Sequence, residues 1–461
     1  MDAVVTLAAN VVSRRYEDLP PQVVDVTKMS ILDTVGVMLA ASSVSVGEGC
    51  QQIIDLVREF GGKPESTILA FGDRVPCYLA AFANGSLTHP LDYDDYREGA
   101  HVHPTSETLP AALAAAERLG GVSGKDFIAA IALGNDLVCR LGLATAGWIT
   151  GHDWLIPQVL GFFGGAAAAG KLLGLSQGQM VDAMGIALSQ ASGSGEVVLG
   201  VGSMIRSIRD GFSQKAGLLS ALLAQKGVTG ATNVLEGEAG LFALYFKGDY
   251  DREALTTDLG RTFEGLNVTF KPWPACRGTH SYVEAALSLA RENHLTPEGI
   301  DKIVLGVTKS TRAHCEPTAQ RQRPTLAIDA KFSLPFTVGA ALAHGQLIIA
   351  DFLPSGLSDR QTLSLAQKTS YTLAPELEGP GITPGLVEIR TRDGRTLSRR
   401  VDIAYGDPRN PIGRDGLVAK FRDCARYSAK PMPPAIVEEV IHRVATLERE
   451  EDIRPIIRLV S

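Results

Sequence analysis

Apolar residues recur every three or four positions from residue 1 to about 265 of this 461-residue chain, the spacing of one buried helix face. The stretches "VVDVTKMSILDTVGVMLAAS" and "DFIAAIALGNDLVCRLGLA" show it clearly, and few strand-like runs interrupt them. Ser123 with Asp126 and Ser176 with Gln179 have the spacing of N-terminal capping boxes. Many alanines and glycines favour close contacts between helix axes. We therefore predict a compact helical bundle.

The pattern changes near Pro272. The run "GIDKIVLGVTKSTR" is rich in β-branched residues and predicts a strand, and "GLVEIRTRDGRTLSRRVDIAYGD" predicts a hairpin with its turn at Asp393-Gly394. Between them, "TLAIDAKFSLPFTVGAALAHG" predicts one helix, and helix returns in "PPAIVEEVIHRVATLERE". The expected fold is mostly α with a smaller α+β domain: a helical domain formed by 1–268 and 405–461, with an α/β domain inserted at 269–404.

Composition narrows the classes of partner. A formal net charge of -7 argues against nucleic acid or an anionic membrane surface and favours small molecules or copies of the same chain. The six cysteines are scattered without a CxxC pair, which fits a reducing cytosol. The N-terminal apolar run has its arginines after it, the reverse of a secretory signal, and no window of 18 apolar residues occurs. We expect a soluble cytoplasmic protein.

Residues 84–104, "NGSLTHPLDYDDYREGAHVHP", gather three aspartates and three of the nine histidines. Pro90 and Pro104 argue against a regular helix, so we expect a loop between two helices. Neighbouring carboxylates and the histidines at 101 and 103 suit general acid/base chemistry. A solvated acidic loop with capping aspartates is the alternative. A metal site is a third interpretation, although no standard ligand spacing is present.

Two further stretches carry basic residues. In "QASGSGEVVLGVGSMIRSIRDG" the glycines match neither a phosphate-binding loop nor a dinucleotide fingerprint. Arg206 and Arg209 lie three apart, on one face of a helix, and could clamp a carboxylate, although an exposed, solvated face is the commoner explanation for two nearby arginines.

In the stretch "FKPWPACRGTHSYVEAALSLA", the residues Lys271, Cys276, Arg277 and His280 lie close together just before and into a predicted helix. Helix starts favour anions, so Lys271 and Arg277 would suit a carboxylate ligand. Cys276 could be a nucleophile beside His280, or an inert small hydrophobe.

The order of these pieces along nearly the whole chain resembles the MmgE/PrpD family. The resemblance rests on "SILDTVGVMLAAS", "NGSLTHPLDYDD" with "HVHP", "FFGGAAAAGKLLGLS", "QASGSGEVV", "VLEGEAGLF", "FKPWPACRGTH" and "DAKFSLPFTVGAAL". The family includes 2-methylcitrate dehydratase, cis-aconitate decarboxylase and iminodisuccinate epimerase, which act on small polycarboxylates without a metal or redox cofactor. The resemblance implies a helical domain from both chain ends, an α/β lid, a homodimer, and an active site between the two domains.

Carried over residue by residue, the resemblance places the acid/base loop at Asp92 and His103, and Lys271 as the anion-binding or proton-handling lysine. Two positions depart from the family pattern. Ile156 stands where relatives have the histidine of "HPT", and "IRSIR" replaces a "TKPLH"-like run, with Arg206 for the lysine and Arg209 for the histidine. Arginine binds carboxylates but does not exchange a proton near neutral pH. Whether His152, four residues before Ile156, substitutes for the missing histidine is left open.

We therefore predict a cofactor-independent lyase or isomerase that abstracts a proton α to a carboxylate of a small di- or tricarboxylate. His103 is the expected acid or base, and Asp92 orients it or shares its proton. Substrate carboxylates are expected to meet Lys271, Arg206 and Arg209, with Cys276, Arg277 and His280 as secondary binding candidates. Dehydration, decarboxylation and epimerisation all fit. A catalytically dead carboxylate-binding homologue and a metal-dependent enzyme are the alternatives.

Overall fold

The computed structural model describes residues 1–45, 47–146, 153–199, 203–379 and 384–461. The chain forms two compact units. The helical unit contains Met1–Pro90, Asp94–Thr269 and Arg414–Ser461, and the sheet unit contains Leu91–Tyr93 and Phe270–Gly413.

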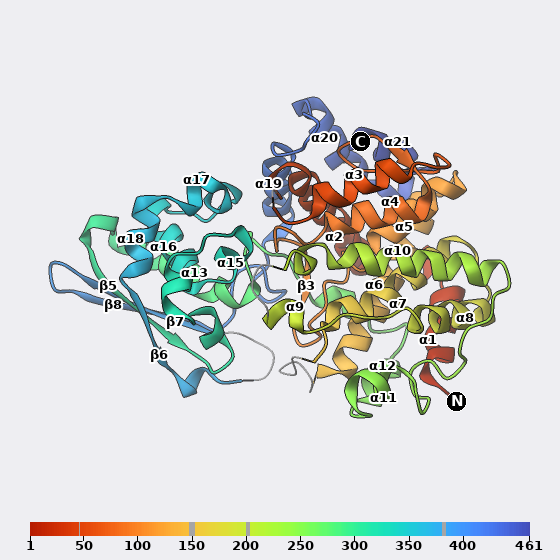
Figure 1. Cartoon of the computed structure of the whole chain (residues 1–461), viewed down its shortest axis with the longest axis horizontal. Helices are drawn as coiled ribbons and strands as arrows, with labels where there is room; N and C mark the ends of the chain where they lie inside the picture. Colours follow the sequence, from red (N-terminus) through yellow and green to blue (C-terminus); the bar gives the residue numbers. More distant parts are fainter. Residues whose placement is uncertain (46, 147–152, 200–202, 380–383) are drawn as a thin grey trace. The chain divides into compact units, whose positions relative to one another are not determined.

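The helical unit is built from helices supplied by both ends of the chain (Figure 1). Its helices are α1 Ala3–Ser13, α2 Pro21–Val44, α3 Cys50–Phe60, α4 Cys77–Ser86, α5 Leu109–Leu119, α6 Gly124–Ala144, α7 Ile156–Leu172, α8 Gln177–Leu188, α9 Glu196–Leu199, α10 Ile205–Gln225, α11 Leu241–Phe246, α12 Arg252–Thr256, α19 Gly413–Ala425, α20 Pro434–Ala445 and α21 Arg454–Leu459. Two short ribbons, β1 Ser66–Thr67 with β2 Arg74–Val75 and β3 Tyr96–Arg97 with β4 Val268–Thr269, are antiparallel.

The predicted helix starts are confirmed. The side chain of Ser123 accepts a hydrogen bond from the backbone N–H of Asp126 at the start of α6, and Ser176 and Gln179 form a reciprocal capping box at α8.

Glycines allow the close packing of α10. A Cβ at Gly217 would lie 2.7 Å from the backbone nitrogen of Ala166 in α7, too close for any side chain. Small residues therefore set the spacing between the helices that carry the site described below.

Helix α6 passes a length and hydropathy test for crossing a membrane, which we did not expect from the sequence. Ninety-four per cent of its most apolar 18-residue window is buried inside the protein. A helix that is buried on all sides lies in the centre of the core. Such a position requires apolar residues around the whole circumference of the helix.

The sheet unit has one four-stranded sheet in the order β6-β5-β7-β8. Its elements are α13 Arg277–Asn293, β5 Ile300–Val307, α14 Thr318–Gln322, α15 Ala327–Lys331, α16 Leu334–His344, α17 Pro354–Leu357, α18 Arg360–Gln367, β6 Thr369–Leu373, β7 Gly385–Thr391 and β8 Thr396–Val401. Strand β5 is parallel to β6 and antiparallel to β7, and β7 and β8 form the predicted hairpin. Gly394 in its turn has φ +88°, a conformation that glycine adopts without strain.

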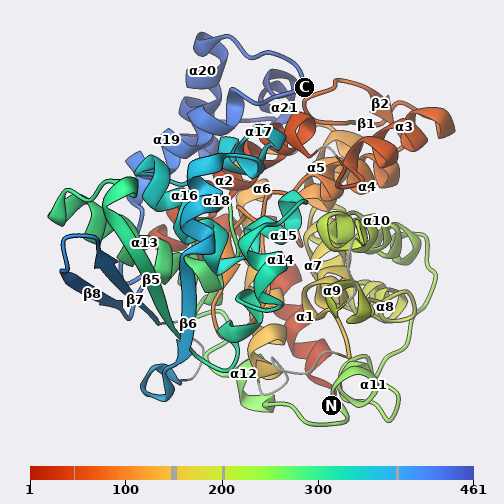
Figure 2. The same ribbon diagram turned by 60° about the vertical axis from the view of Figure 1, so that its left-hand side comes forward.

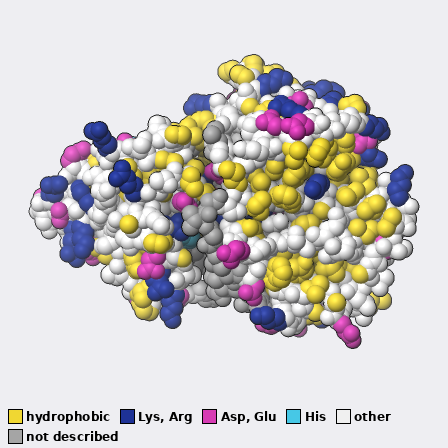
Figure 3. All heavy atoms as spheres, in the orientation of Figure 1, with side chains coloured by type: hydrophobic (Ala, Val, Ile, Leu, Met, Phe, Trp, Pro, Cys, Tyr) yellow, Lys and Arg dark blue, Asp and Glu magenta, His cyan; other side chains and the backbone are white. Residues whose placement is uncertain are grey.

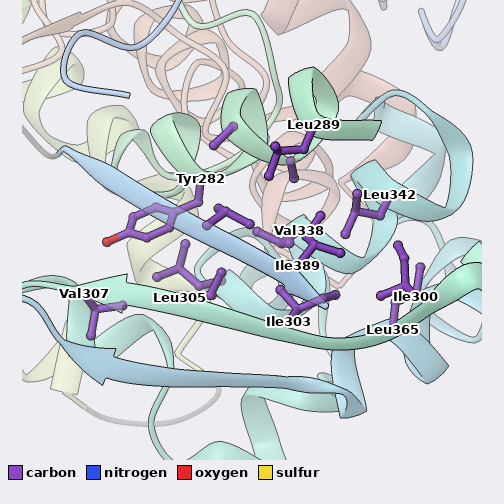
Figure 4. Close-up of a cluster of buried hydrophobic side chains, with 14 of the residues drawn as sticks. Tyr282, Leu289, Ile300, Ile303, Leu305, Val307, Val338, Leu342, Leu365 and Ile389 are labelled. Atoms are coloured by element: carbon purple, nitrogen blue, oxygen red, sulfur yellow. The ribbon is translucent and has the colours of Figure 1, made fainter. Parts of the chain in front are cut away.

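The core of the sheet unit lies between the strands and helices α13 and α16 (Figures 2 and 4). Ile303, Leu305 and Val307 of β5 point to this core at alternate positions, where they meet Tyr282 of α13 and Val338 of α16. The alternation in the sequence is thus the signature of a strand covered by helices on one face.

The single helix expected over 325–345 is wrong. The structure divides this segment into α15 and α16, with Phe332 and Ser333 between them. The side chain of Ser333 accepts a hydrogen bond from the backbone N–H of Phe336 and so starts a new helix, and Pro335 has no N–H to continue the previous one.

Candidate active site

The loop between α4 and α5 is non-helical, as predicted, and buries most of its titratable side chains. His89, Asp94, Asp95 and His103 are each at most 7% exposed. Strand β3 in this loop pairs with β4 and fixes the loop against a distant part of the helical unit. Buried polar side chains need partners, so the contacts of these four side chains determine the local chemistry.

Asp94 lies between two imidazoles. Its Oδ1 is 3.1 Å from Nδ1 of His89, and its Oδ2 is 3.0 Å from Nδ1 of His103. Ser106 donates a hydrogen bond to Oδ2 at 2.7 Å. The two imidazole rings meet edge to face with centroids 4.6 Å apart, and the ring of Tyr96 packs on His103. Because Asp94 faces Nδ1 of His103, Nε2 is the nitrogen left to exchange a proton with another group.

Burial and charge set different protonation states within this group. Burial, with Arg209 nearby, lowers the pKa of His89 to about 3, so this imidazole is neutral at physiological pH. Burial alone would raise the pKa of Asp94, but its two imidazole neighbours hold it well below its usual value. The group therefore contains a neutral His89 beside a carboxylate that is held in its charged form.

The start of α10 brings Arg209 and Asp210 into the same buried region. Nε of Arg209 is 3.5 Å from Oδ1 of Asp210, and Nη1 donates to the backbone oxygen of Arg206 at 3.3 Å. Among the described residues, Nη2 of Arg209 has no hydrogen-bond partner, although the side chain is 2% exposed. A buried guanidinium with an unused N–H group is suited to binding an anion.

Glu107 is the third carboxyl group of this region. Its Oε1 accepts a hydrogen bond from the backbone N–H of His103 at 2.9 Å. Burial, reinforced by Asp210, raises the pKa of Glu107 well above its usual value, and burial also raises the pKa of Asp210. Burial thus opposes the ionised form of both carboxyl groups beside Arg209.

Asp92 and Lys271 contact each other within the sheet unit. Nζ of Lys271 forms a short ion pair with Oδ1 of Asp92 and donates to its backbone oxygen at 3.0 Å. Both side chains are almost fully buried, and Asp92 has a left-handed backbone at φ +47°. The contact within the helical unit that orients His103 comes from Asp94, whereas Asp92 pairs with lysine. The catalytic roles of Asp92 and Lys271 stay predictions from the resemblance.

The other candidates of the sheet unit make contacts at the start of α13. Arg277 donates to the backbone oxygens of Tyr405 and Ala404 at 3.0 and 3.3 Å, so much of its hydrogen bonding is intramolecular. Nε2 of His280 lies 3.0 Å from the backbone oxygen of Ala275, and burial lowers the pKa of His280 well below its usual value.

The histidine found beside Cys276 is His314, not the expected His280. Sγ of Cys276 is 3.9 Å from Nε2 of His314. His280 follows Cys276 closely in sequence, but its Nε2 is directed to the backbone of Ala275, before the helix begins. A substrate-binding role for Cys276, Arg277 and His280 stays a prediction.

Sequence reasoning did not single out His89, Asp94, Glu107 and Asp210. For His89 and Asp94, the sequence did offer a sign of their role, because both lie in one loop with His103. Asp210 directly follows Arg209, but we considered only the arginines of that segment. Ile156 is the first residue of α7 and is buried, and His152 lies outside the described residues.

Two domains of one known family match this chain in succession. Residues 5–253 match the MmgE/PrpD N-terminal domain and residues 273–444 match the MmgE/PrpD C-terminal domain. A cis-aconitate decarboxylase-like protein of Aspergillus oryzae is 29% identical over 96% of this chain and 94% of its own length. Cis-aconitate decarboxylase of Aspergillus terreus is 27% identical over 96% and 93%, and that of Homo sapiens is 30% identical over 94% and 89%. With both domains of the family matched in order over most of its length, this chain belongs to the MmgE/PrpD family.

Proposed function

We propose that this protein is a cofactor-independent lyase of a small di- or tricarboxylate, with decarboxylation of cis-aconitate or a close analogue as the reaction to test first. The relatives named above are cis-aconitate decarboxylases or are described as similar to one. The buried contact between Asp94 and His103, beside Arg209, is the observation that carries the proposal.

His103 supplies the proton in this proposal. When the C–C bond to a carboxylate breaks, its electron pair stays on carbon and CO2 leaves. The imidazolium of His103 then gives the Nε2 proton to the substrate carbon, and solvent restores it. Asp94, whose Oδ2 lies 3.0 Å from Nδ1, stabilises the charged imidazolium. Positioned histidines of this kind contribute roughly 10²- to 10⁴-fold to the rate.

Arg209 holds a substrate carboxylate. A carboxylate bound at Nη2 would satisfy the buried N–H group and place negative charge close to the histidines. Burial raises the pKa of Asp210, which weakens the competition of this neighbouring carboxyl group for the guanidinium. Binding of this kind adds charge-assisted hydrogen bonds of about 1.5 to 3 kcal/mol each.

Dehydration is the second candidate, because the same residues support the reverse direction of proton transfer. A neutral His103 would remove the proton α to a carboxylate, and the imidazolium so formed would give that proton to the departing hydroxyl group, which leaves as water. Ile156 replaces a histidine of the family pattern, and Arg206 replaces a lysine. Each replacement removes a side chain that could assist either reaction. Epimerisation and binding without turnover remain alternatives for the same reason.

A proton NMR time course in D2O separates these reactions. Purified protein is incubated with cis-aconitate, 2-methylcitrate, citrate and iminodisuccinate, each with a parallel His103→Gln sample. Decarboxylation gives new olefinic signals, one deuterium in the product, and CO2. Dehydration gives an alkene without CO2, and epimerisation gives deuterium exchange. No change in any substrate, combined with a raised melting temperature, would replace the proposal with a binding role.

We also propose that the chain forms a homodimer through the helical unit. Figure 3 shows apolar side chains gathered on one face of that unit, where α3, α4 and α10 reach the surface. Leu56, Tyr78 and Met204 on or next to these helices are 38 to 44% exposed. Apolar patches of this kind mark contact surfaces. Light scattering on a sizing column should give twice the mass of one chain, and a monomer at micromolar concentration would contradict the proposal.

A further inference from the structure

The geometry points to a binding site for a divalent transition-metal ion of the zinc class, formed by His89, Asp94 and His103, whose occupation switches off His103. Metal binding itself does not depend on the proposed function. The inhibition that it would cause does rest on that function.

The three side chains offer ligand atoms in a compact arrangement. One ligand atom from each lies within 4.8 Å of the others. The N–O separations are 3.1 Å from His89 and 3.0 Å from His103 to the Asp94 carboxylate. Ligands about 2.1 Å from a tetrahedral zinc ion are roughly 3.3 to 3.5 Å apart. The carboxylate and each imidazole are thus already near ligand spacing, and small ring rotations would complete the set.

The orientation of His103 gives independent support. Although Oδ2 of Asp94 lies 3.0 Å from Nδ1 of His103, this nitrogen makes no hydrogen bond of good geometry with any described residue. The side chain is 7% exposed, so solvent reaches little of it. A short N–O distance without a directed N–H bond is what two ligands of one ion show, because each lone pair points at the metal and not at the other ligand.

The chemistry of the donors selects the class of ion. Two imidazole nitrogens and one carboxylate suit Zn²⁺, Co²⁺, Ni²⁺ or Cu²⁺, whereas Mg²⁺ and Ca²⁺ prefer oxygen ligands alone. Three protein ligands leave a fourth position for water. Ser106, which donates to Oδ2 of Asp94, would support the carboxylate from behind.

The surrounding charges act in both directions. Arg209 disfavours positive charge at His89, and this repulsion opposes a metal ion. Asp94 is already anionic, and Asp210 and Glu107 interact electrostatically with the same region. Because Arg209 opposes the ion while the charged Asp94 favours it, we expect moderate affinity, in the micromolar range and weaker than a structural zinc site.

An ion at this position would remove His103 from acid/base chemistry. Coordination through Nδ1 replaces the proton that faces Asp94 and fixes the ring. The metal ion also takes over the carboxylate that would stabilise the imidazolium. The protein would then be active when free of metal and inhibited when zinc is bound, the opposite of a metal-dependent enzyme.

Cobalt titration of the full chain, first dialysed against EDTA, tests binding without substrate. We expect one equivalent of Co²⁺ to develop the visible absorption of four- or five-coordinate cobalt, and Zn²⁺ to displace it. His89→Gln and Asp94→Asn should each weaken binding at least tenfold. His101→Gln is the matched control, because His101 lies in the same loop but contacts Tyr96, and its affinity should match the parent protein. Circular dichroism confirms that each variant is folded.

A competing site on the sheet unit provides the outcome that would overturn the assignment. Nδ1 of His344 lies 2.7 Å from Asp351 and Nε2 lies 3.5 Å from Asp359. If cobalt affinity falls in His344→Gln and is unchanged in His89→Gln, the metal belongs there. Absence of cobalt binding at any site also rejects the inference.

The inhibition step has its own readout. With a turned-over substrate in hand, micromolar Zn²⁺ should lower kcat and EDTA should restore it, with a weaker effect in His89→Gln. If zinc binds in the titration but turnover is unchanged, the metal site stands and the role of His103 as the acid is rejected. If no substrate is found, the titration still decides the metal site.

Discussion

Asp94 faces Nδ1 of His103 at 3.0 Å, and both side chains are buried in one loop of the helical unit. A carboxylate in this position defines which imidazole nitrogen is available and stabilises the positive charge that the ring gains on protonation. His89 binds the same carboxylate from the other side but has its pKa lowered to about 3 by burial. In the proposed mechanism the two histidines therefore have different roles: His89 is a neutral structural partner and His103 is the proton carrier.

Changing this pair should affect the chemical step and leave substrate binding intact. We expect His103→Gln to lower kcat by about 10²- to 10⁴-fold, because the proton donor is lost. Asp94→Asn should lower kcat less, since the ring remains while its orienting charge is gone. KM should change little in both. His101→Gln should retain normal kcat, and normal kcat in His103→Gln would remove this residue from the mechanism.

Arg209 should determine substrate affinity. Arg209→Lys keeps the charge but loses the planar group that can bind a carboxylate through two N–H bonds. We expect KM to rise about 10- to 100-fold, equivalent to one charge-assisted hydrogen bond, with kcat reduced less. Arg422→Lys is the matched control, because Arg422 forms an exposed pair with Glu438. Equal KM values in the two variants would show that Arg209 does not bind substrate.

Local features of the fold could be predicted from the sequence because their causes are local. The caps at Ser123 and Ser176 and the turn at Asp393-Gly394 depend on residues within a few positions of each other. The prediction of one helix over 325–345 was wrong for a related reason. The apolar periodicity continues across Ser333, but the side chain of this one residue caps a new helix.

The site was harder to predict because its contacts join distant residues. Lys271 and Asp92 are 179 positions apart, and Glu107 and Asp210 are brought together by the packing of separate segments. Sequence reasoning named His103, Asp92 and Lys271 through the family pattern, but it could not show that Asp94 faces His103 while Asp92 faces lysine. Which carboxylate serves which base depends on the folded chain.

The buried pair of Lys271 and Asp92 should stabilise the sheet unit only while both partners are present. Lys271→Met leaves a buried carboxylate without its cation and should cost about 3 to 5 kcal/mol of unfolding free energy. Adding Asp92→Asn should recover most of that loss, because asparagine is uncharged and tolerates the left-handed backbone of this position. Urea unfolding of both single variants and the double variant measures the coupling. Additive effects would show that the two side chains do not interact.

Glu65 should make folding stability depend on pH in the acid range. Burial opposes its ionisation, but the backbone N–H of Cys77, with Lys63 and Arg118, outweighs burial and lowers the pKa of Glu65 from 4.5 to about 2. Since the folded protein holds the charged form, the stabilisation is complete above about pH 4.5, the unfolded value, and is lost as the pH falls through 2. Glu65→Gln should therefore reduce stability at pH 7 by on the order of 1 to 2 kcal/mol, the value of a hydrogen bond to a charged group.

The same substitution should have a shrinking effect as the pH is lowered below 4.5, because Glu65 of the unfolded parent chain then binds a proton and the unfolded state is favoured. Urea unfolding of both proteins at pH 7, 5, 4 and 3 gives the difference at each pH. Glu17→Gln is the control, because Glu17 is exposed and pairs with Lys125 on the surface, so its removal should not change the measured stability. A difference for Glu65→Gln that is constant from pH 7 to pH 3 would show that packing, and not the charge of Glu65, is what the substitution removes.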